Sequence, residues 1–339
     1  MNEIDTLIRG GRLGEGATEA IFARLMAGEL DDAQIGALLA LLQHGGPTVD
    51  EVVGGARVMR AKVERVPFEP TGDQRLIDTC GTGGAPKTFN VSTAAAIVAA
   101  AAADGRVRVA KHGNRSRTGR GSAEVLGALG VNVDASVETQ AACLREVGVC
   151  FCFAIHHHPA MRHVIGPRKS LGVPTIFNVL GPLTNPAGAK RQLIGVYAPH
   201  LVDLVSGALA RLGTDRAIVM HSREGLDEIG LAGVTDAAVV DGNTIERMEI
   251  EPARLGLASV SHERLVVDDV AESAKVIRRV LAGEAGGPRD MVVVNAAAAL
   301  FVAGVCDSVE RGVPMAQEAI DSGRAAEVLA QLASRSHAE

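Results

Sequence analysis

Large aromatic side chains are scarce in this chain. Its 339 residues contain no tryptophan, one tyrosine and seven phenylalanines, although hydrophobic residues make up 47% of the sequence. Most of that apolar content is alanine and valine, so the core must be built largely from small side chains that pack closely. Charged residues make up 22%, which is ordinary for a globular protein with a solvated surface.

Signals for export, for a membrane and for a positively charged surface are also scarce. No N-terminal signal peptide is visible, and the longest nearly apolar run, residues 94–103, is about half the length that spans a bilayer. A formal net charge of −6 argues against affinity for nucleic acid spread over the surface, although a local basic cleft is compatible with it. We therefore expect no membrane association and no nucleic-acid partner.

Cysteine pairs with the spacing of a disulfide framework or a zinc site are missing. The five cysteines are odd in number, which fits a reducing cytoplasm better than an oxidising compartment. Cys150 and Cys152 fall on one face of an expected strand and should serve packing. Cys80, beside a glycine-rich loop, is expected to be a small buried residue rather than a catalytic thiol.

The chain divides into a helical part and a part in which strands and helices alternate. Residues 1–66 repeat apolar side chains at helical spacing, and Thr48 with Glu51 forms a capping box; a proline- and glycine-containing linker follows. The alternation of strands and helices favours a mostly parallel sheet covered by helices on both faces. Helices are expected again from residue 268 to the end. The strands are predicted at 75–79, 107–110, 149–154, 192–197 and 216–220, with a hairpin around 237–250.

A glycine cluster follows the first expected strand. Gly81, Gly83 and Gly84 leave backbone N–H groups open to a ligand, and an alanine-rich helix begins at Ser92. Open N–H groups and the positive end of a helix together form a site for phosphate or pyrophosphate. The Ser92 hydroxyl can cap the helix or bind a metal that such an anion holds.

Residues 81–88 also resemble the nucleoside-triphosphate loop GxxxxGK[ST], but they miss it by one position. Pro86 stands where the second glycine is needed, and proline has no N–H to offer. No strand that ends in an acidic residue follows at a suitable place to hold magnesium for such a loop. A kinase or an ATPase is therefore disfavoured.

A second polar segment follows the next expected strand. The pentapeptide 111–115 reads Lys-His-Gly-Asn-Arg, and the basic loop 116–122 after it leads into another helix. In open α/β sheets ligands bind at the carboxyl ends of the strands. Two anion-binding loops on neighbouring strands predict a substrate that carries several phosphates.

Three further groups of residues have competing interpretations. Asp227 and Glu228 follow a strand end at the same edge; adjacent carboxylates are usually a surface pair, but they also suit magnesium beside a diphosphate. Pro167 is expected to break or redirect the chain just before Arg168. The three histidines at 156–158 are interpreted as a strand-end loop, because adjacent side chains on an extended segment point in alternating directions.

Taken in order, these motifs resemble those of anthranilate phosphoribosyltransferases, which join a phosphoribosyl group to anthranilate in tryptophan biosynthesis. The resemblance rests on four segments and covers nearly the whole chain: 81–93, 111–115, 177–186 and 225–228. It implies an α/β protein of nucleoside phosphorylase-like architecture, with a small N-terminal helical domain and a larger domain whose mostly parallel sheet is flanked by helices. The helical domain would be residues 1–66 with a returning segment near 164–181, the substrate-binding domain residues 75–339, and two subunits would pair through the helical domain.

The resemblance also implies a role for each matching residue. Anthranilate would contact Gly81, Asn114 and Arg168, with the Arg168 guanidinium on its carboxylate. Mg²⁺ would be held by Ser92, Asp227 and Glu228. The residues that would bind 5-phosphoribosyl 1-diphosphate are Gly81, Gly84, Ala85, Thr88, Asn90, Val91, Ser92, Thr93, Lys111 and Ser122.

Two departures from the family pattern fall on the phosphate side. Ala85 stands where most relatives have an aspartate, and both phosphate loops are one residue shorter than usual. Arg117 or Arg120 is expected to supply phosphate contacts that relatives make with lysine or serine. For Asn114 the alternative to a substrate contact is a turn residue that tolerates left-handed backbone.

Two alternative functions remain at this point. A pyrimidine nucleoside phosphorylase would have a similar architecture and bind inorganic phosphate, but the segments 111–115 and 178–186 disfavour it. A non-catalytic, nucleic-acid-binding relative is disfavoured by the negative net charge and by the intact pair Asp227 and Glu228.

Overall fold

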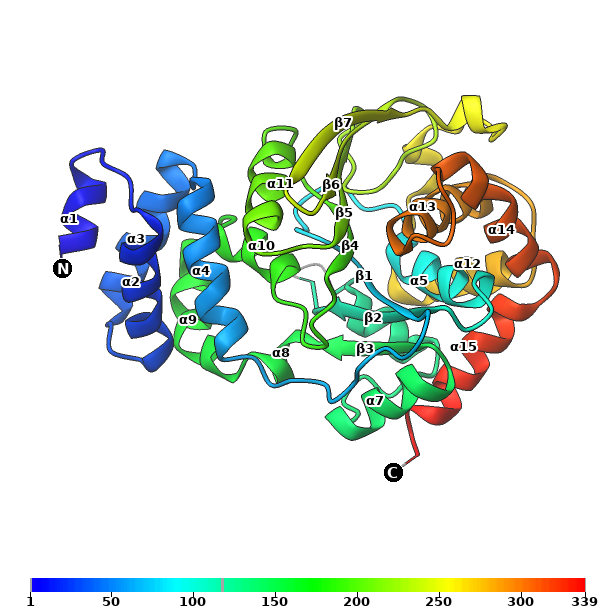
Figure 1. Ribbon diagram of the computed structural model, residues 1–339, viewed down its shortest axis with the longest axis horizontal. Helices are drawn as coiled ribbons and strands as arrows, with labels where there is room; N and C mark the ends of the chain where they lie inside the picture. Colours follow the sequence, from blue (N-terminus) through cyan, green and yellow to red (C-terminus); the bar gives the residue numbers. More distant parts are fainter. Residues whose placement is uncertain (1, 117–118, 339) are drawn as a thin grey trace.

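Four N-terminal helices form a small lobe beside a larger α/β lobe in the computed structural model, which describes residues 2–116 and 119–338 (Figure 1). The helices are α1 (Asn2–Ile8), α2 (Glu15–Ala27), α3 (Asp32–Gly45) and α4 (Val49–Ala61). The predicted capping box starts α4: the Glu51 N–H donates to the Thr48 hydroxyl at 3.2 Å, and the Glu51 carboxylate accepts from the Thr48 N–H at 2.8 Å.

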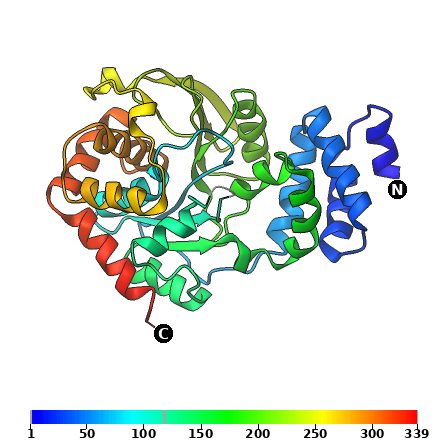
Figure 2. The same ribbon diagram turned by 180° about the vertical axis from the view of Figure 1, so that it is seen from behind.

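A later segment of the chain returns to this helical lobe. It comprises α9 (Arg162–Leu171) and α10 (Ile176–Leu180); α9 packs against α2 and α3, and α10 against α3 and α4. In Figure 2 a green part of the chain lies beside the blue N-terminal helices. The predicted break at Pro167 is wrong, because Pro167 lies inside α9. The missing N–H removes one backbone hydrogen bond, and burial of Pro167 and Val164 against the lobe offsets that loss.

The larger lobe is built on one seven-stranded sheet with the order β3-β2-β1-β4-β5-β6-β7. The first five strands in the chain run parallel, and β6 with β7 forms the predicted antiparallel hairpin. All seven lie where the sequence predicts them, to within a few residues. Their bounds are β1 (Arg75–Gly81), β2 (Val107–Gly113), β3 (Val149–Phe153), β4 (Arg191–Gly195), β5 (Arg216–Ser222), β6 (Thr235–Asp241) and β7 (Thr244–Ile250).

Helices cover both faces of this sheet. Side chains alternate along β5: Ile218 and Met220 join the core around α5 and α13, whereas Ala217 and Val219 join the core of α11 and the helical lobe. The remaining helices are α5 (Val91–Ala102), α6 (Ser122–Ala128), α7 (Val137–Glu146), α8 (Ala154–His157), α11 (Leu201–Arg211), α12 (Val270–Leu281), α13 (Gly287–Ala303), α14 (Val309–Asp321) and α15 (Arg324–Arg335). Within the described residues, no helix is long and apolar enough to cross a bilayer.

The core uses small side chains, as the composition predicts. Every residue of α5 except Ser92 is buried, and α5 packs on α13, whose centre is also mostly alanine and valine. Cys150 and Cys152 are buried with their sulfurs 3.7 Å apart, and Cys80 is buried as well. All five cysteines are free thiols.

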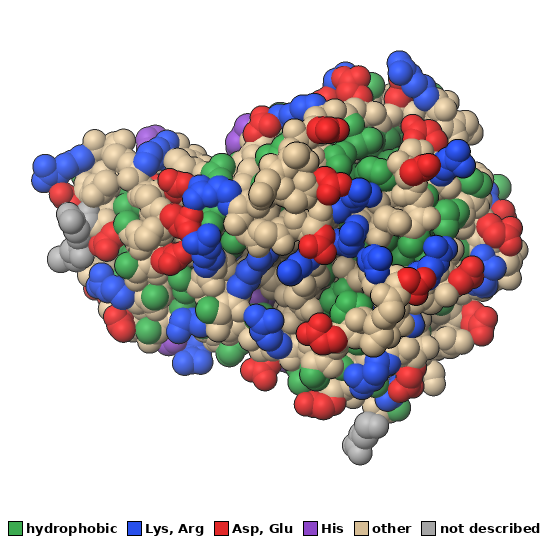
Figure 3. All heavy atoms as spheres, in the orientation of Figure 1, with side chains coloured by type: hydrophobic (Ala, Val, Ile, Leu, Met, Phe, Trp, Pro, Cys, Tyr) green, Lys and Arg blue, Asp and Glu red, His purple; other side chains and the backbone are tan. Residues whose placement is uncertain are grey.

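On the face drawn in Figure 3, acidic and basic side chains are interspersed over the larger lobe.

Candidate active site

The parallel strands end at one edge of the sheet, and the predicted site residues follow them there. Gly81 at the end of β1 pairs in register with Gly195 at the end of β4, which pairs in turn with Met220 of β5. β2 lies on the other side of β1 and ends at Gly113. Since open α/β sheets bind ligands beyond the carboxyl ends of their strands, this edge is the candidate site.

The loop between β1 and α5 has the open backbone that the sequence predicts. Gly83 and Gly84 have φ angles of 62° and 97°, which residues with a side chain rarely adopt. Thr82 ties the loop to β4: its N–H donates to the Gly195 carbonyl at 3.0 Å, and its hydroxyl accepts from the Tyr197 N–H at 3.0 Å. The loop therefore leads into the positive end of a buried helix.

Ser92 is the second residue of α5, and the N-cap is Asn90. The Asn90 amide makes no cap bond; its oxygen accepts from the Ser273 hydroxyl at 2.9 Å. The Ser92 hydroxyl accepts instead from the ammonium of Lys111 at 3.2 Å, so the capping alternative for Ser92 is not realised. Lys111 is buried and also donates to the Thr79 carbonyl at 2.6 Å, which ties β2 to β1 and α5.

The acidic pair after β5 sits directly on the glycine loop. The backbone of Gly83 hydrogen-bonds to the Asp227 carboxylate, and the Ser92 N–H donates to a Glu228 carboxylate oxygen at 3.2 Å. A Cβ built on Gly81 would lie only 3.0 Å from the Asp227 carboxylate. The structure thus brings together the three residues predicted to hold a metal, although Glu228 follows Ser92 by 136 positions in the chain.

Two half-buried carboxylates side by side carry more negative charge than their surroundings neutralise. Burial, followed by the repulsion of Asp227, raises the pKa of Glu228 to about 8. Burial also raises the pKa of Asp227, and burial lowers the pKa of Lys111. A divalent cation would relieve this repulsion, and carboxylate and hydroxyl oxygens are ligands that Mg²⁺ accepts. The residues present therefore fit a magnesium ion completed by phosphate oxygens and water.

The loop after β2 lies against the glycine loop. The Arg120 carbonyl accepts from the Lys87 ammonium at 3.3 Å and from the Asn90 amide at 3.4 Å, while the Arg120 guanidinium donates to the Val267 carbonyl. The two predicted phosphate loops are therefore joined to each other. Arg117, the other candidate for a phosphate contact, lies outside the described residues.

Asn114 and Ser122 stand at the two ends of that second loop. Asn114 is exposed, and its side-chain oxygen accepts from the Arg115 N–H at 2.8 Å. Ser122 is the first residue of α6, and its hydroxyl lies 3.5 Å from the Asn114 carbonyl. The remaining predicted residues lie on the glycine loop or at the start of α5; they are Gly81, Ala85, Thr88, Val91 and Thr93.

Arg168 approaches the same edge from the helical lobe. Its guanidinium donates to the side-chain oxygen of Asn178 at 3.4 Å and stacks over the Phe177 ring at 5.2 Å. The Asn178 amide nitrogen then donates to the Thr82 carbonyl of the glycine loop at 3.3 Å. This chain of contacts places Arg168 two hydrogen bonds from the glycine loop.

Known proteins share both the sequence and the fold. Residues 73–326 match the glycosyl transferase family, a/b domain, and residues 3–63 match its helical bundle domain. The anthranilate phosphoribosyltransferase of Anaeromyxobacter sp. (strain K) is 48% identical over 331 residues, which cover 97% of this chain and 96% of the relative. The chain belongs to the anthranilate phosphoribosyltransferase family. The resemblance seen in the motifs is confirmed, and with it the prediction of a phosphoribosyl-transferring enzyme.

Solved anthranilate phosphoribosyltransferases have the same architecture. The crystal structure from Thermus thermophilus is 38% identical, covers all of both chains and has a TM-score of 0.91. That from Saccharomyces cerevisiae in complex with PRPP and Mg is 23% identical, has a TM-score of 0.89 and covers 99% of this chain and 97% of its own. The predicted fold class, a small helical domain with a larger domain built on a mostly parallel sheet, is confirmed.

The histidines at 156–158 were predicted to form a loop, and that prediction is wrong. His156 and His157 belong to α8, and the buried His157 ring is fixed by the Glu64 carbonyl at 2.7 Å and the Gln140 side chain at 2.9 Å. Burial lowers the pKa of His158 to about 4. The centroid of its ring lies 5.2 Å from that of His112 in the second polar segment. The local sequence pattern gave no sign of this contact. Among the described residues there is no cluster of three or more potential metal ligands of the His, Cys, Asp and Glu types.

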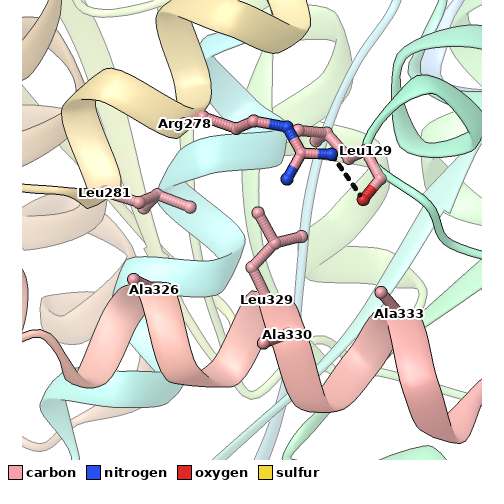
Figure 4. Close-up of a pocket in the computed structure, with 7 residues that line it drawn as sticks. All are labelled: Leu129, Arg278, Leu281, Ala326, Leu329, Ala330 and Ala333. Carbon is pink, nitrogen blue, oxygen red and sulfur yellow. Dashed lines mark hydrogen bonds between the residues drawn. The ribbon is translucent and has the colours of Figure 1, made fainter.

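A separate pocket lies between α12 and α15, away from the strand ends (Figure 4). Its lining is almost wholly apolar, and its one charged residue, Arg278, donates to the Leu129 carbonyl at 3.1 Å. With a single polar group that is already hydrogen-bonded, this pocket offers no chemistry. The residues that line it are Leu129, Arg278, Leu281, Ala326, Leu329, Ala330 and Ala333.

Proposed function

We propose that this chain transfers the phosphoribosyl group of 5-phosphoribosyl 1-diphosphate to the amine of anthranilate, which yields N-(5-phosphoribosyl)anthranilate and diphosphate in tryptophan biosynthesis. One observation carries the proposal: Asp227 and Glu228 lie against the glycine loop and the start of α5. An anion site with a carboxylate pair beside it suits a phosphorylated substrate bound together with a divalent cation. Membership of the family supports the same reaction.

The diphosphate would lie on the loop amides and the first turn of α5. Gly81, Gly84 and Ala85 offer backbone N–H groups in a loop whose φ angles glycine permits. Lys111 and Ser122 are the proposed side-chain contacts from the second loop. The further residues assigned to this substrate are Thr88, Asn90, Val91, Ser92 and Thr93.

Mg²⁺ is the proposed cofactor, held by Ser92, Asp227 and Glu228 with phosphate oxygens and water. Bound there, the ion would neutralise charge on the departing diphosphate. A relative from Saccharomyces cerevisiae has been solved with PRPP and Mg, which supports the choice of metal. The protein's own contribution is to keep two carboxylates at the phosphate loop despite their mutual repulsion.

Anthranilate would approach from the side of the helical lobe. The Arg168 guanidinium is the proposed partner of its carboxylate, since a planar fork of donors matches a carboxylate. Gly81 and Asn114 would contact the aromatic amine and orient it toward C1 of the ribose. Because an aromatic amine is already unprotonated at neutral pH, no strong general base is required. Alignment and charge neutralisation can each contribute several kcal/mol to the rate.

A fluorescence assay tests the proposed reaction. Anthranilate fluorescence should fall only when PRPP and Mg²⁺ are both supplied, with one diphosphate released for each anthranilate consumed. Phosphate-dependent cleavage of pyrimidine nucleosides without consumption of anthranilate would instead identify the nucleoside phosphorylase alternative. Binding of nucleic acid with neither reaction would identify the non-catalytic one.

We also propose the domain division and the assembly that the resemblance implies. The helical domain comprises residues 1–66 and the returning segment 164–181, and residues 75–339 form the other domain; family matches at 3–63 and 73–326 support this division.

A homodimer through the helical domain is supported by exposed apolar side chains there, Ile8, Ile165 and Val173, which are 66%, 52% and 52% exposed. Light scattering on the protein as it elutes from a size-exclusion column would measure its molar mass and hence the number of subunits. The free thiols support a cytoplasmic location, which cell fractionation would test.

A further inference from the structure

The loop that carries the acidic pair is anchored by a residue far along the chain. Asn295 lies fully buried in α13, and its side-chain oxygen accepts from the Ile229 N–H at 3.0 Å. Its amide nitrogen donates to the Ile229 carbonyl at 3.1 Å and to the Met291 carbonyl at 2.8 Å. Both backbone polar groups of the residue that follows Glu228 are therefore fixed to a helix beneath the sheet edge.

The opposite side of the same loop rests on the end of β4. A Cβ built on Gly195 would overlap the Asp227 carbonyl oxygen and lie 2.5 Å from its carbonyl carbon. Non-bonded carbon atoms approach to roughly 3.5 Å, so any side chain at Gly195 would displace the Asp227 backbone by about 1 Å. The Gly195 carbonyl also accepts from the Thr82 N–H at 3.0 Å, so one peptide supports both the glycine loop and the acidic loop.

We propose that Asn295 and Gly195 are positioning residues. They hold Asp227 and Glu228 against the glycine loop, where the two carboxylates can bind magnesium beside the diphosphate. This inference rests on the proposed function. Two adjacent carboxylates repel each other, and a surface loop would relax by moving them apart. A buried two-way hydrogen bond on one side and a backbone contact that only glycine permits on the other side prevent that movement.

The first test compares Asn295→Ala with Val302→Ala. Both remove atoms from buried positions of α13, but of the two side chains only that of Asn295 can hydrogen-bond to the acidic loop. Loss of the pair of hydrogen bonds should raise the magnesium concentration for half-maximal rate, and the KM for PRPP, by about tenfold or more. The KM for anthranilate should stay unchanged. Val302→Ala should lower Tm without shifting the magnesium requirement.

The second test compares Gly195→Ala with Gly127→Ala. A Cβ on Gly127 in α6 meets nothing within 4 Å, so its variant should keep wild-type kinetics. A displacement of about 1 Å in the Asp227 backbone should lower kcat/KM for PRPP by on the order of a hundredfold. Calorimetric titration of Mn²⁺ into each protein with PRPP, without anthranilate, gives a readout that does not depend on turnover. Weaker Mn²⁺ binding is expected for both Asn295→Ala and Gly195→Ala.

The outcomes separate this inference from the proposed function. A wild-type protein that consumes no anthranilate with PRPP and Mg²⁺ would overturn the function. A magnesium-dependent wild type whose Asn295→Ala variant binds Mn²⁺ normally and matches Val302→Ala in kinetics would overturn the inference alone. Should Gly195→Ala fail to fold, as circular dichroism would show, the Asn295→Ala comparison still decides the outcome.

Discussion

Replacing Glu228 with glutamine should stabilise the metal-free protein at high pH while it removes a proposed metal ligand. Burial and the adjacent Asp227 raise the pKa of Glu228 from 4.5 to about 8. Because the folded pKa lies above the unfolded one, the protonated carboxyl favours folding; this contribution is complete below about pH 4.5 and is lost as pH rises through about 8. Glutamine resembles the protonated form at every pH, so the variant should not suffer that loss.

The size of the effect follows from the shift. One pKa unit corresponds to about 1.4 kcal/mol, so a shift from 4.5 to about 8 sets an upper bound of about 5 kcal/mol. Glu228 is only half-buried, and solvent screening reduces this to on the order of 2 kcal/mol. For a chain of this size, we expect the Tm of the variant at pH 9 to be about 3 °C higher than that of the wild type.

Thermal unfolding followed by circular dichroism in EDTA, at pH 5 and pH 9, measures this difference. The Tm of Glu228→Gln relative to that of the wild type should be higher at pH 9 than at pH 5. The control variant Glu318→Gln changes an exposed residue of α14, and its relative Tm should be the same at both pH values. An equal Tm difference between Glu228→Gln and the wild type at both pH values would refute the reasoning, because it would mean that the Glu228 carboxylate is not destabilised in the folded protein.

Three further predictions concern the substrates. Asp227→Asn combined with Glu228→Gln should abolish the magnesium dependence of the residual rate with the fold intact, as initial rates over a magnesium series and circular dichroism would show; unchanged dependence would contradict the metal assignment. Arg168→Ala removes a charge-assisted contact of roughly 1.5–3 kcal/mol, so steady-state kinetics should show a KM for anthranilate that is 10-fold or more higher, roughly, with the KM for PRPP nearly unchanged; an equal rise in both would argue against the carboxylate role. Asn114→Gly should lower kcat by on the order of a hundredfold at near-normal Tm if the amide orients the amine, whereas wild-type turnover would leave Asn114 as a turn residue.

The sequence predicts most of the sheet well because β1, β2, β4 and β5 are short, largely apolar runs that end in glycine or serine. β1, β2 and β5 all begin where the sequence places them, and the hairpin of β6 and β7 is found by its Asp-Gly-Asn turn. The glycine loop, the loop after β2 and the acidic pair could be located from local pattern because loops at parallel strand ends meet at one edge. The role of each single residue, including that of Arg168 in α9, was implied only by the resemblance to the family and stays a prediction.

Features that depend on packing could not be predicted from local pattern. Pro167 stays inside α9 because the helix is held from outside by its neighbours, which propensity does not record. His157 is fixed by a backbone carbonyl 93 residues away. Asn295 gives no signal in the sequence, since its partner Ile229 lies 66 residues earlier and meets it only after the sheet has formed.

The burial of α5 has a consequence for how this sequence can change over time. The helix follows the glycine loop that is proposed to bind diphosphate, and ten consecutive positions from Thr93 to its end are buried. A single added methylene in such a core costs typically about 1–3 kcal/mol, a large part of the net stability of a domain. Substitutions that survive along this helix should therefore exchange alanine with glycine or serine rather than with larger residues. Divergence among functional descendants of this chain would accumulate on the outward faces of α12, α14 and α15, while the side chains of α5 keep their size.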